Sequence, residues 1–458
     1  MEVYAIPFQK GFVIYKPRRR LAFIGNAALV RYVELRGSPA VPEDPEVERF
    51  LEAVRFDEPC LPCETVPLCG DGPRPRHAVL LMTNRCNLRC VYCYADAGAA
   101  QEPAELDWAT ARSAIDYALE NAQEDGMPPS LTFHGGGEPT MHWDLLVRAV
   151  DYARSRDPRT QVSMSSNGIW SSSQREFVCR HFSSVSLSMD GIPAVQNRQR
   201  PLAGGGPSHD AVMESIEALD LASVDYGIRM TALEESVDSL PESIAFICQV
   251  SKTKTVQIEP TFTSSRGRYA DISSQFADLF SQNFMAAWRI GQDLGCQVYY
   301  SGARPHAITA MFCQAPIKAL VVTADGRLVT CFEISSGTSL AASRFFVGRI
   351  RDGRVEYDRA ALASFLEEQQ RRREECVDCF CYWHCAGDCA TRRPVSGQPR
   401  DGRCRATRNI TLGLLLAFME EGGGVWQGLV QSGDAASPMP PPASLRDGSE
   451  AALEDYGP

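Results

Sequence analysis

Three closely spaced cysteines carry the strongest chemical signal in the chain. Cys86, Cys90 and Cys93 are separated by three and then two residues, and they follow an apolar run that is typical of a strand. Three thiolates at this spacing can wrap one face of a cubane 4Fe–4S cluster. The fourth iron then has no protein ligand, and an open coordination position is where a small molecule binds and reacts. A zinc knuckle without its fourth ligand is the alternative for this loop alone.

Short polar motifs close the next three apolar runs. Gly135-Gly136-Gly137-Glu138-Pro139 follows the second run, Ser166-Asn167-Gly168 the third and Ser188-Met189-Asp190-Gly191 the fourth. Glycine lets a backbone approach a ligand closely, and Glu138 offers an acceptor for an ammonium group. Each motif alone is an ordinary turn, and Glu138 with Asp190 would also allow a general acid–base pair. Their succession on consecutive strand ends favours one shared site.

Together these motifs resemble the radical S-adenosylmethionine superfamily, in which an aromatic residue, here Tyr92, precedes the third cysteine. The resemblance implies that Cys86, Cys90 and Cys93 ligate a catalytic 4Fe–4S cluster. S-adenosyl-L-methionine would chelate the free iron, and one electron would cleave it to a 5′-deoxyadenosyl radical. The cofactor contacts implied by the resemblance are Tyr92 near the adenine, Glu138 at the methionine ammonium, Ser188 at the ribose, Arg200 at the carboxylate, and Gly136, Gly137, Ser166, Asn167 and Asp190.

A second set of cysteines lies between residues 306 and 410. Its members are Cys313, Cys331, Cys376, Cys379, Cys385, Cys389 and Cys404. Their spacing resembles the SPASM domain, which binds two auxiliary 4Fe–4S clusters. By that resemblance the outer cluster is held by Cys376, Cys379, Cys385 and Cys404, and the inner one by Cys313, Cys331 and Cys389. A zinc ribbon is the alternative, although seven ligands suit tetrahedral zinc sites poorly.

The array departs from the fullest family pattern at one place. Members with a fully ligated inner cluster carry another cysteine soon after the first, and Gln314–Leu320 holds none. The inner cluster is therefore expected to have an open iron or a ligand other than cysteine. Candidates to fill the position are Cys381, Cys60, Cys63 and Cys69, and the last three could also bind a metal of their own.

Alternating segments are expected to position these motifs. In residues 73–290, helical stretches alternate with six apolar runs, at 78–83, 130–135, 161–166, 184–190, 227–232 and 255–260. Strand–helix alternation predicts parallel β/α units, and chemistry is expected at the carboxyl ends of such strands. The predicted fold class is α/β, a partial TIM-like (β/α)6 barrel followed by a cysteine-rich C-terminal auxiliary-cluster domain.

The two ends of the chain have different patterns. Residues 1–72 predict a small α+β region of three short strands and two amphipathic helices. This layout resembles the winged-helix domains that recognise leader peptides, and an extension packed on the barrel is the alternative. Residues 422–458 are rich in Gly, Pro, Ser and acidic residues and are predicted to be a disordered tail.

Composition limits the class of protein. The 458 residues carry a formal net charge of −11, which argues against nucleic acid or an anionic membrane as the main partner. The chain shows neither a transmembrane run nor a signal-peptide pattern, so a cytoplasmic protein is expected. In a reducing compartment its clustered cysteines are metal ligands rather than disulfides.

One residue helps to choose the reaction. Families that join these two modules include sulfatase activators and cross-linking maturases of ribosomal peptides. In sulfatase activators an aspartate follows the cysteine that here is Cys331 and acts as a base, whereas this chain has Phe332 and then Glu333. The resemblance therefore favours an oxidoreductase that cross-links a nearby-encoded peptide, supplied with electrons by a flavodoxin- or ferredoxin-type protein. A sulfatase maturase, a sugar or aminoglycoside dehydrogenase, a non-catalytic iron–sulfur electron carrier and a zinc-stapled scaffold are the alternatives.

Overall fold

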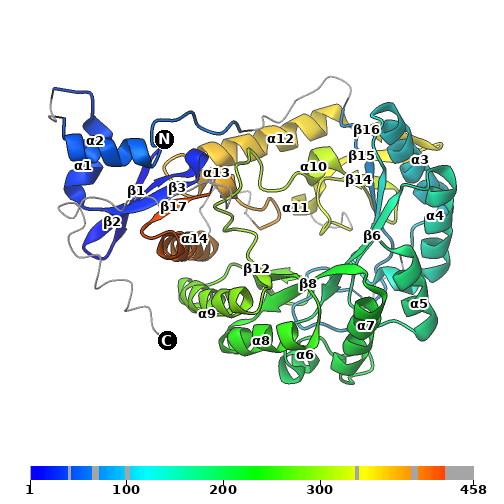
Figure 1. Ribbon diagram of the computed structural model, residues 1–458. Helices are drawn as coiled ribbons and strands as arrows, with labels where there is room; N and C mark the ends of the chain where they lie inside the picture. Colours follow the sequence, from blue (N-terminus) through cyan, green and yellow to red (C-terminus); the bar gives the residue numbers. More distant parts are fainter. Residues whose placement is uncertain are drawn as a thin grey trace.

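A partial barrel forms the centre of the molecule (Figure 1). The computed structural model describes residues 2–39, 43–63, 72–97, 104–335, 340–392 and 401–428. The barrel strands are β4 (His77–Leu81), β5 (Ser130–His134), β6 (Gln161–Ser166), β7 (Ser184–Ser188), β8 (Asp225–Ala232) and β9 (Thr255–Pro260). Each pairs in parallel with the next along the chain. The predicted (β/α)6 arrangement is confirmed.

The helices that follow these strands lie close to the stretches that the periodicity predicts, apart from the short helix Pro193–Gln199 after β7, which was not predicted. They are α3 (Trp108–Glu124), α4 (Trp143–Arg156), α5 (Ser172–His181), α6 (Pro193–Gln199), α7 (His209–Ala222), α8 (Leu240–Val250) and α9 (Ser274–Asp293). Local signals set their starts, since Asp107 caps α3 and Ser171 forms a capping box with Gln174 at α5.

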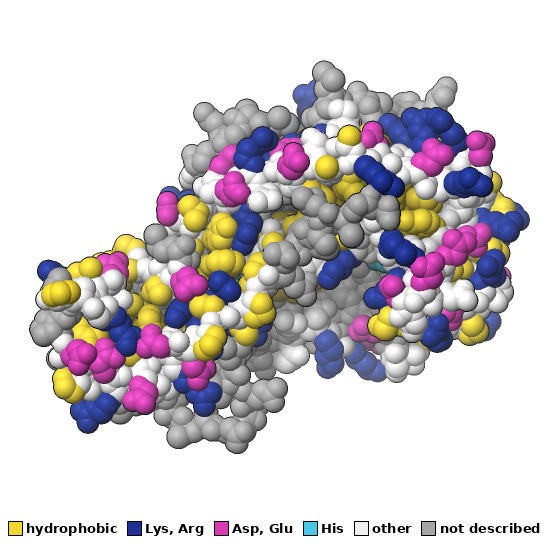
Figure 2. All heavy atoms as spheres, turned by 90° about the horizontal axis from the view of Figure 1, so that it is seen from above, with side chains coloured by type: hydrophobic (Ala, Val, Ile, Leu, Met, Phe, Trp, Pro, Cys, Tyr) yellow, Lys and Arg dark blue, Asp and Glu magenta, His cyan; other side chains and the backbone are white. Residues whose placement is uncertain are grey.

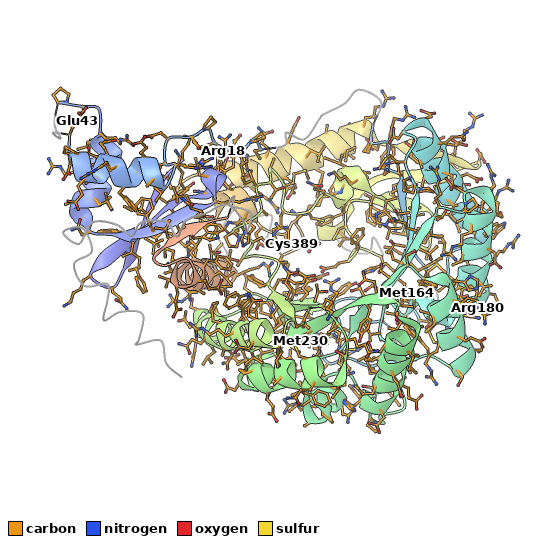
Figure 3. All side chains as sticks on the ribbon, in the orientation of Figure 1. Arg18, Glu43, Met164, Arg180, Met230 and Cys389 are labelled. Atoms are coloured by element: carbon orange, nitrogen blue, oxygen red, sulfur yellow. The ribbon has the colours of Figure 1, made fainter. Side chains whose placement is uncertain are left out.

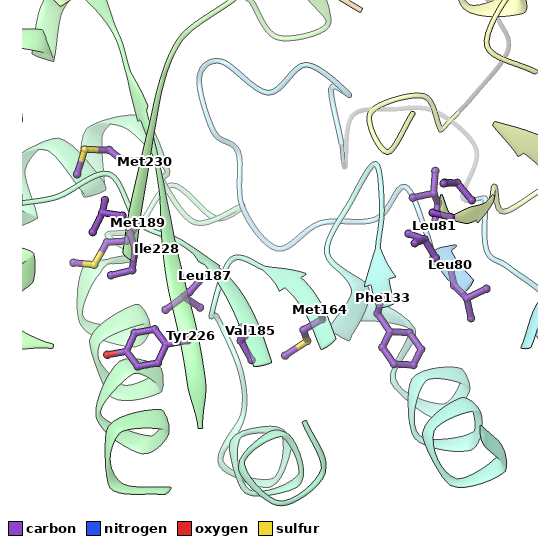
Figure 4. Close-up of a cluster of buried hydrophobic side chains, with 14 of the residues drawn as sticks. Leu80, Leu81, Phe133, Met164, Val185, Leu187, Met189, Tyr226, Ile228 and Met230 are labelled. Carbon is purple, nitrogen blue, oxygen red and sulfur yellow. The ribbon is translucent and has the colours of Figure 1, made fainter. Parts of the chain in front are cut away.

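The two faces of the barrel sheet differ in polarity. One face buries apolar side chains such as Phe133, Leu187 and Ile228 against the helices (Figure 4), and this burial is the main stabilising term. The other face carries polar side chains. Three of them are neighbours, since Thr132 Oγ1 lies 2.7 Å from both Ser163 Oγ and His77 Nε2. Half-buried polar groups therefore line the inside of the barrel.

The sheet extends beyond the six predicted strands. β12 (Gln297–Tyr299) pairs in parallel with β9, and β13 (Leu320–Val322) pairs in parallel with β4. Three antiparallel strands then follow, β14 (Arg327–Val329), β15 (Phe346–Arg351) and β16 (Arg354–Tyr357). Three of these strands, β12, β13 and β14, have three residues each. Strands of this length are too short for their periodicity to be recognised in a sequence.

The cysteine-rich region has more regular structure than its sequence predicted. It contains the helices α12 (Arg359–Glu374), α13 (Tyr382–Cys385) and α14 (Asp401–Glu421). The last of these runs past the predicted boundary at 410 and packs along α9, with the Trp288 and Phe418 rings 6.0 Å apart. Buried Leu362, Phe365 and Ile410 add an apolar core. These residues belong to the same apolar core as the barrel.

The N-terminal region has the predicted strands and helices. They are β1 (Tyr4–Phe8), β2 (Gly11–Lys16), β3 (Leu21–Gly25), α1 (Ala27–Leu35) and α2 (Pro45–Ala53). The predicted tail is wrong at its start, because β17 (Val425–Gln427) joins this sheet antiparallel to β3. Trp426 is buried there and stacks on Phe418 at 5.5 Å. The two apolar residues Val425 and Trp426 suffice to add an edge strand where an apolar surface is present. The rest of the predicted tail, residues 429–458, lies outside the described part.

The surface mixes both signs of charge. On the face shown in Figure 2, acidic and basic side chains are interspersed. In the part of the chain that the structure describes, every helix is too short or too polar to span a bilayer.

Candidate active site

The three-cysteine loop lies at the carboxyl end of β4, where a barrel places its chemistry. The end of α6 and the residues that follow it hold the loop from one side. Arg89 N donates to Pro201 O at 2.8 Å, and Val91 N donates to Gln199 O at 2.9 Å. The loop is therefore anchored to the chain that follows the fourth barrel strand.

The three thiols of the loop lie close enough to affect one another's ionisation. Burial raises the pKa of Cys86 to about 12, with smaller contributions from Cys90 and Cys93. Burial likewise raises the pKa of Cys90 to about 11. The backbone N–H groups of Leu88 and Ala97 donate to the sulfurs of Cys86 and Cys93 at 3.5 and 3.4 Å. Clustered, half-buried sulfurs with N–H donors fit an iron–sulfur cluster, which displaces the thiol protons on binding.

A mononuclear metal ion makes a different demand on its ligands. In the described ranges, no three His, Cys, Asp or Glu side chains form a group that could hold a single ion. Thiolates around a cubane need not converge in this way, because each binds a different iron.

The glycine motif after β5 packs directly on the cysteine loop. Gly137 N donates to Thr83 O at 2.9 Å, and Glu138 N donates to Arg85 O at 2.8 Å. A Cβ at Gly137 would lie 2.0 Å from Arg85 O, and one at Gly136 would lie 2.5 Å from Ser335 Oγ. Both glycines were predicted to contact the cofactor. The structure shows that each permits a close approach between two parts of the chain.

Replacement of Gly137 by alanine should therefore displace the cysteine loop. We expect the free energy of unfolding to fall by about 1–3 kcal/mol, because a methyl group is forced against a backbone carbonyl. Gly204→Ala is the matched control, since no heavy atom lies within 4 Å of a Cβ there. Urea denaturation of the three proteins measures the effect, and equal stability of both variants would contradict it.

Glu138 is bound by the protein itself. Its Oε1 accepts hydrogen bonds from Thr140 Oγ1 at 2.8 Å and Ser166 Oγ at 2.7 Å, and its Oε2 accepts one from Asn167 N at 2.8 Å. Burial raises the pKa of the Glu138 carboxyl, and these hydrogen bonds oppose that effect. The carboxylate thus joins the ends of β5 and β6, and its predicted contact with the methionine ammonium stays a prediction.

Asn167 continues the network to the cysteine loop. Its Nδ2 donates to Asn87 Oδ1 at 2.8 Å and lies 3.7 Å from Cys86 Sγ. Ser166 Oγ accepts a further hydrogen bond from Trp170 Nε1 at 2.8 Å. The sequence predicted Ser166 and Asn167 as cofactor contacts, and the structure places them behind the cysteine loop as its support.

Asp190 is the centre of a second network. Its Oδ2 accepts hydrogen bonds from Tyr92 OH at 2.5 Å and Gln199 Nε2 at 2.7 Å. Its Oδ1 accepts from Arg200 Nη2 at 3.0 Å and Thr231 N at 2.9 Å. The Asp190 side chain is completely buried. This carboxylate fixes the two predicted cofactor contacts Tyr92 and Arg200, which sequence reasoning could not show.

The remaining predicted contacts face the same region. Arg200 lies over the Tyr92 ring, with 5.3 Å from its guanidinium carbon to the ring centre, and its positive charge partly offsets the raised pKa of Cys90. Ser188 ends β7 and is half-buried. In the described residues its hydroxyl makes no hydrogen bond, so it is available to a ligand.

The predicted inner set of C-terminal cysteines is brought together. Burial, and then the charges of Glu333, Cys389 and Cys313, raise the pKa of Cys331 well above its ordinary value. Cys389 lies near the centre of the molecule, between the barrel and the C-terminal helices (Figure 3). Three of the seven cysteines therefore share one neighbourhood.

The predicted outer set also gathers. Burial raises the pKa of Cys404 to about 11, and nearby Cys376 and Cys379 add to it. Burial likewise raises the pKa of Cys385 well above its ordinary value, with contributions from Cys404 and Cys379. Cys404 belongs to α14, so this helix ties the outer set to α9.

The cysteines suggested as a further ligand of the inner cluster have other surroundings where the structure describes them. Cys381 is buried beside Thr411 Oγ1, 3.5 Å from its sulfur, and hydrogen-bonds to Cys379. It lies with the outer set, so its suggested place in the inner set is wrong. Cys60 and Cys63 lie on either side of Leu61, whose backbone makes hydrogen bonds with Arg18 of the N-terminal region. Cys69 lies outside the described residues.

Cys379 should be a more acidic thiol than Cys385 and Cys404 of the outer set in iron-free protein. The hydrogen bond from Cys381 lowers the pKa of Cys379 to about 6. Because the thiolate is the reactive form, alkylation of Cys379 by iodoacetamide should be half-maximal near this pH, while that of Cys86 should still rise in alkaline solution. Mass spectrometry over a pH series measures both. Cys381→Ala should shift the Cys379 midpoint upward, and an unchanged midpoint would contradict the assignment.

The segment that carries Cys331 of the inner set borders the end of the barrel. The Phe332 ring packs 5.6 Å from the His134 ring at the end of β5. Burial raises the pKa of Tyr94 well above its ordinary value, and Glu333, Cys93 and Cys331 add to it, so Tyr94 lies near both cysteine groups. Both groups thus border one region of the protein.

The residues after Cys331 leave no free base there. Phe332 has no basic atom, and the Glu333 carboxylate is engaged by Arg392 Nη2 at 2.6 Å and Thr391 Oγ1 at 3.1 Å. The position that is a base in sulfatase activators therefore cannot act as one here.

Comparison with known proteins supports the assignment of the barrel. The sequence profile of the radical SAM superfamily matches residues 80–247. The chain is 27% identical over 175 residues to an uncharacterized protein, MJ0907, of Methanocaldococcus jannaschii, and 31% identical over 160 residues to the Fe-coproporphyrin III synthase of Methanosarcina barkeri. It is 26% identical over 200 residues to the sporulation killing factor maturation protein SkfB of Bacillus subtilis.

These matches cover only parts of the proteins. They span 38%, 35% and 41% of this chain, and 58%, 38% and 44% of the respective relatives. The solved structure of native anSMEcpe with bound AdoMet has a TM-score of 0.60 at 18% identity, over 75% of this chain and 99% of that one. The same protein with AdoMet and the Cp18Cys peptide has a TM-score of 0.58 at 18% identity, over 75% and 98%. Residues 80–247, which form most of the barrel, are a radical SAM domain.

Proposed function

We propose that this protein cleaves S-adenosyl-L-methionine reductively and oxidises, and thereby cross-links, a ribosomally made peptide. Cys86, Cys90 and Cys93 would hold the 4Fe–4S cluster, which supplies the electron for cleavage when bound. Ser188 and Arg200 would bind the cofactor, with Asp190 holding Arg200 in place. The C-terminal domain would be a SPASM domain with two auxiliary clusters.

One observation carries this proposal. Tyr94, next to Cys93, lies near Glu333 and Cys331 of the inner set, and Phe332 packs on the barrel at His134. A substrate bound at the barrel mouth would therefore border both cysteine groups. This arrangement suits a two-step oxidation, in which the first group starts radical chemistry and the second accepts an electron.

A peptide substrate is proposed from two proteins that this chain resembles. SkfB is by its name a maturation protein, and anSMEcpe has been solved with a peptide. One hydrogen atom would pass from the peptide to the 5′-deoxyadenosyl group. The second would leave as a proton and an electron, with the inner auxiliary cluster as the electron acceptor, while a thiol sulfur bonds to the substrate carbon. A flavodoxin- or ferredoxin-type protein of the cytoplasm would supply the first electron.

The N-terminal region would bind the leader of that peptide. The sheet order is β1-β2-β3-β17, so β17 occupies the outer edge of β3 and, among the described strands, β1 is the other edge. An extended peptide adds to a sheet at an unpaired edge, and β1 is the edge that we propose for it.

The test uses anaerobically reconstituted full-length protein. It is incubated with S-adenosyl-L-methionine, dithionite and the short peptide encoded beside the gene. We expect 5′-deoxyadenosine and a peptide product about 2 Da lighter, because two hydrogens are lost. Deoxyadenosine without a change in peptide mass would count against a peptide substrate. Clusters without any deoxyadenosine would favour the iron–sulfur electron carrier.

A further inference from the structure

A short hairpin outside the barrel pattern lies against the three-cysteine loop. β10 (Thr263–Ser265) and β11 (Arg268–Tyr269) pair antiparallel in the connection between β9 and α9. Thr263 Oγ1 donates to Tyr92 O at 3.0 Å, and Gly267 N donates to Cys93 O at 2.8 Å. The tip of the hairpin is thereby fixed to the loop.

Arg266, at the tip, makes the largest number of these contacts. Its Nη1 donates to Cys90 O at 2.7 Å and its Nη2 to Ala97 O at 2.7 Å, while its Nε donates to Asp96 Oδ1 at 2.9 Å. A planar guanidinium holds its donors in a rigid fork. One side chain thus joins chain positions on both sides of Cys93.

The Arg266 guanidinium, with Nη1 2.7 Å from Cys90 O, also places a positive charge next to this cysteine of the loop. The other nearby cation, Arg200, is paired with completely buried Asp190, 3.0 Å from Nε to Oδ2. Arg266 pairs with Asp96, whose side chain is 35% exposed. Water screens an exposed partner, so the field of Arg266 at the loop is less completely cancelled than that of Arg200.

We propose that Arg266 is a positioning residue that clamps the three-cysteine loop and raises the reduction potential of the cluster bound there. Reduction adds a negative charge to a cluster, and a fixed cation nearby stabilises the reduced form. This inference rests on the proposed cluster site, and it is independent of the peptide substrate.

The test is a potentiometric titration of reconstituted full-length protein, followed by electron paramagnetic resonance. The signal to follow is the one that is missing from the Cys86→Ala/Cys90→Ala/Cys93→Ala variant. Arg266→Gln removes the charge, and Arg266→Lys keeps the charge without the fork. Arg268→Gln, at an exposed position in the same hairpin, is the matched control for loss of a positive charge.

We expect Arg266→Gln to reduce the ratio of reduced to oxidised cluster at the wild-type midpoint by about tenfold, which is ~59 mV for one electron. Arg266→Lys and Arg268→Gln should remain near the wild-type midpoint. A wild-type midpoint in Arg266→Gln would overturn the inference. If Arg266→Gln loses the cluster, the midpoints of Arg266→Lys and Arg268→Gln are compared instead. A lower midpoint in Arg266→Lys overturns the inference, and equal midpoints support it. If the triple-cysteine variant lacks none of the wild-type signals, the cluster site itself is refuted.

Discussion

Replacement of Asp190 by asparagine will lower the free energy of unfolding by about 3–5 kcal/mol, because it leaves the buried Arg200 guanidinium without a counter-charge. It will also place an amide N–H₂ group where the carboxylate accepts hydrogen bonds from Tyr92 and Gln199. Tyr92 and Arg200, the two predicted cofactor contacts that Asp190 holds, should then lose their orientation. We expect deoxyadenosine formation to fall by about two orders of magnitude, since small displacements of positioning groups have effects of this size.

Asp210→Asn is the control for this experiment. The Asp210 side chain is 97% exposed and pairs with His209, and exposed pairs contribute little to stability. Urea denaturation and the rate of deoxyadenosine formation are measured for both variants with equal iron content. Wild-type stability in Asp190→Asn would show that the four-donor network around this carboxylate does not hold the site.

Replacement of cysteines in the two groups should separate two steps of the proposed reaction. Cys86→Ala should abolish deoxyadenosine formation, because two thiolates cannot hold the cluster of the first step. Cys331→Ala should leave deoxyadenosine formation within about threefold of wild type, because Cys331 is not one of the three cysteines proposed to hold the first cluster. It should nevertheless abolish the lighter peptide product, because the substrate radical then lacks its electron acceptor.

The control for these variants is Cys179→Ala. Cys179 lies on α5, outside both cysteine groups, and its sulfur donates to Ala218 O at 3.4 Å. Chromatography of deoxyadenosine and the mass of the peptide report the two steps separately. Loss of deoxyadenosine in Cys331→Ala would mean that the C-terminal group supports the barrel itself, and the assignment of separate steps would be wrong.

The barrel was predictable because its signals are local. The runs at 161–166 and 227–232 are strands in the structure, and the spacing of Cys86, Cys90 and Cys93 lies within one loop. Period, capping and ligand spacing depend on neighbours a few residues away. The order of the motifs along the chain then fixed their order along the sheet edge, because consecutive parallel strands lie side by side.

Other features could not be predicted, because their partners are far apart in the sequence. β17 pairs with β3 across almost the whole chain, and its three residues have no recognisable pattern. The hairpin that carries Arg266 was not predicted, although a basic residue flanked by Ser265 and Gly267 is a recognisable turn signal. Nothing in a sequence says which backbone carbonyls such a residue will reach.

The residue types and spacing by themselves therefore determined the barrel, and through the family resemblance they predicted the two cysteine sets and the radical chemistry proposed for the three-cysteine loop. Only the tertiary structure decided which polar groups touch each other. It showed that Glu138 and Asp190 are occupied by the protein's own donors, and that Phe332 covers His134. The reason is that a ligand's chemistry resides in its own side chain, whereas a hydrogen-bond partner is selected by the packing of strand ends that meet only when the whole sheet has formed.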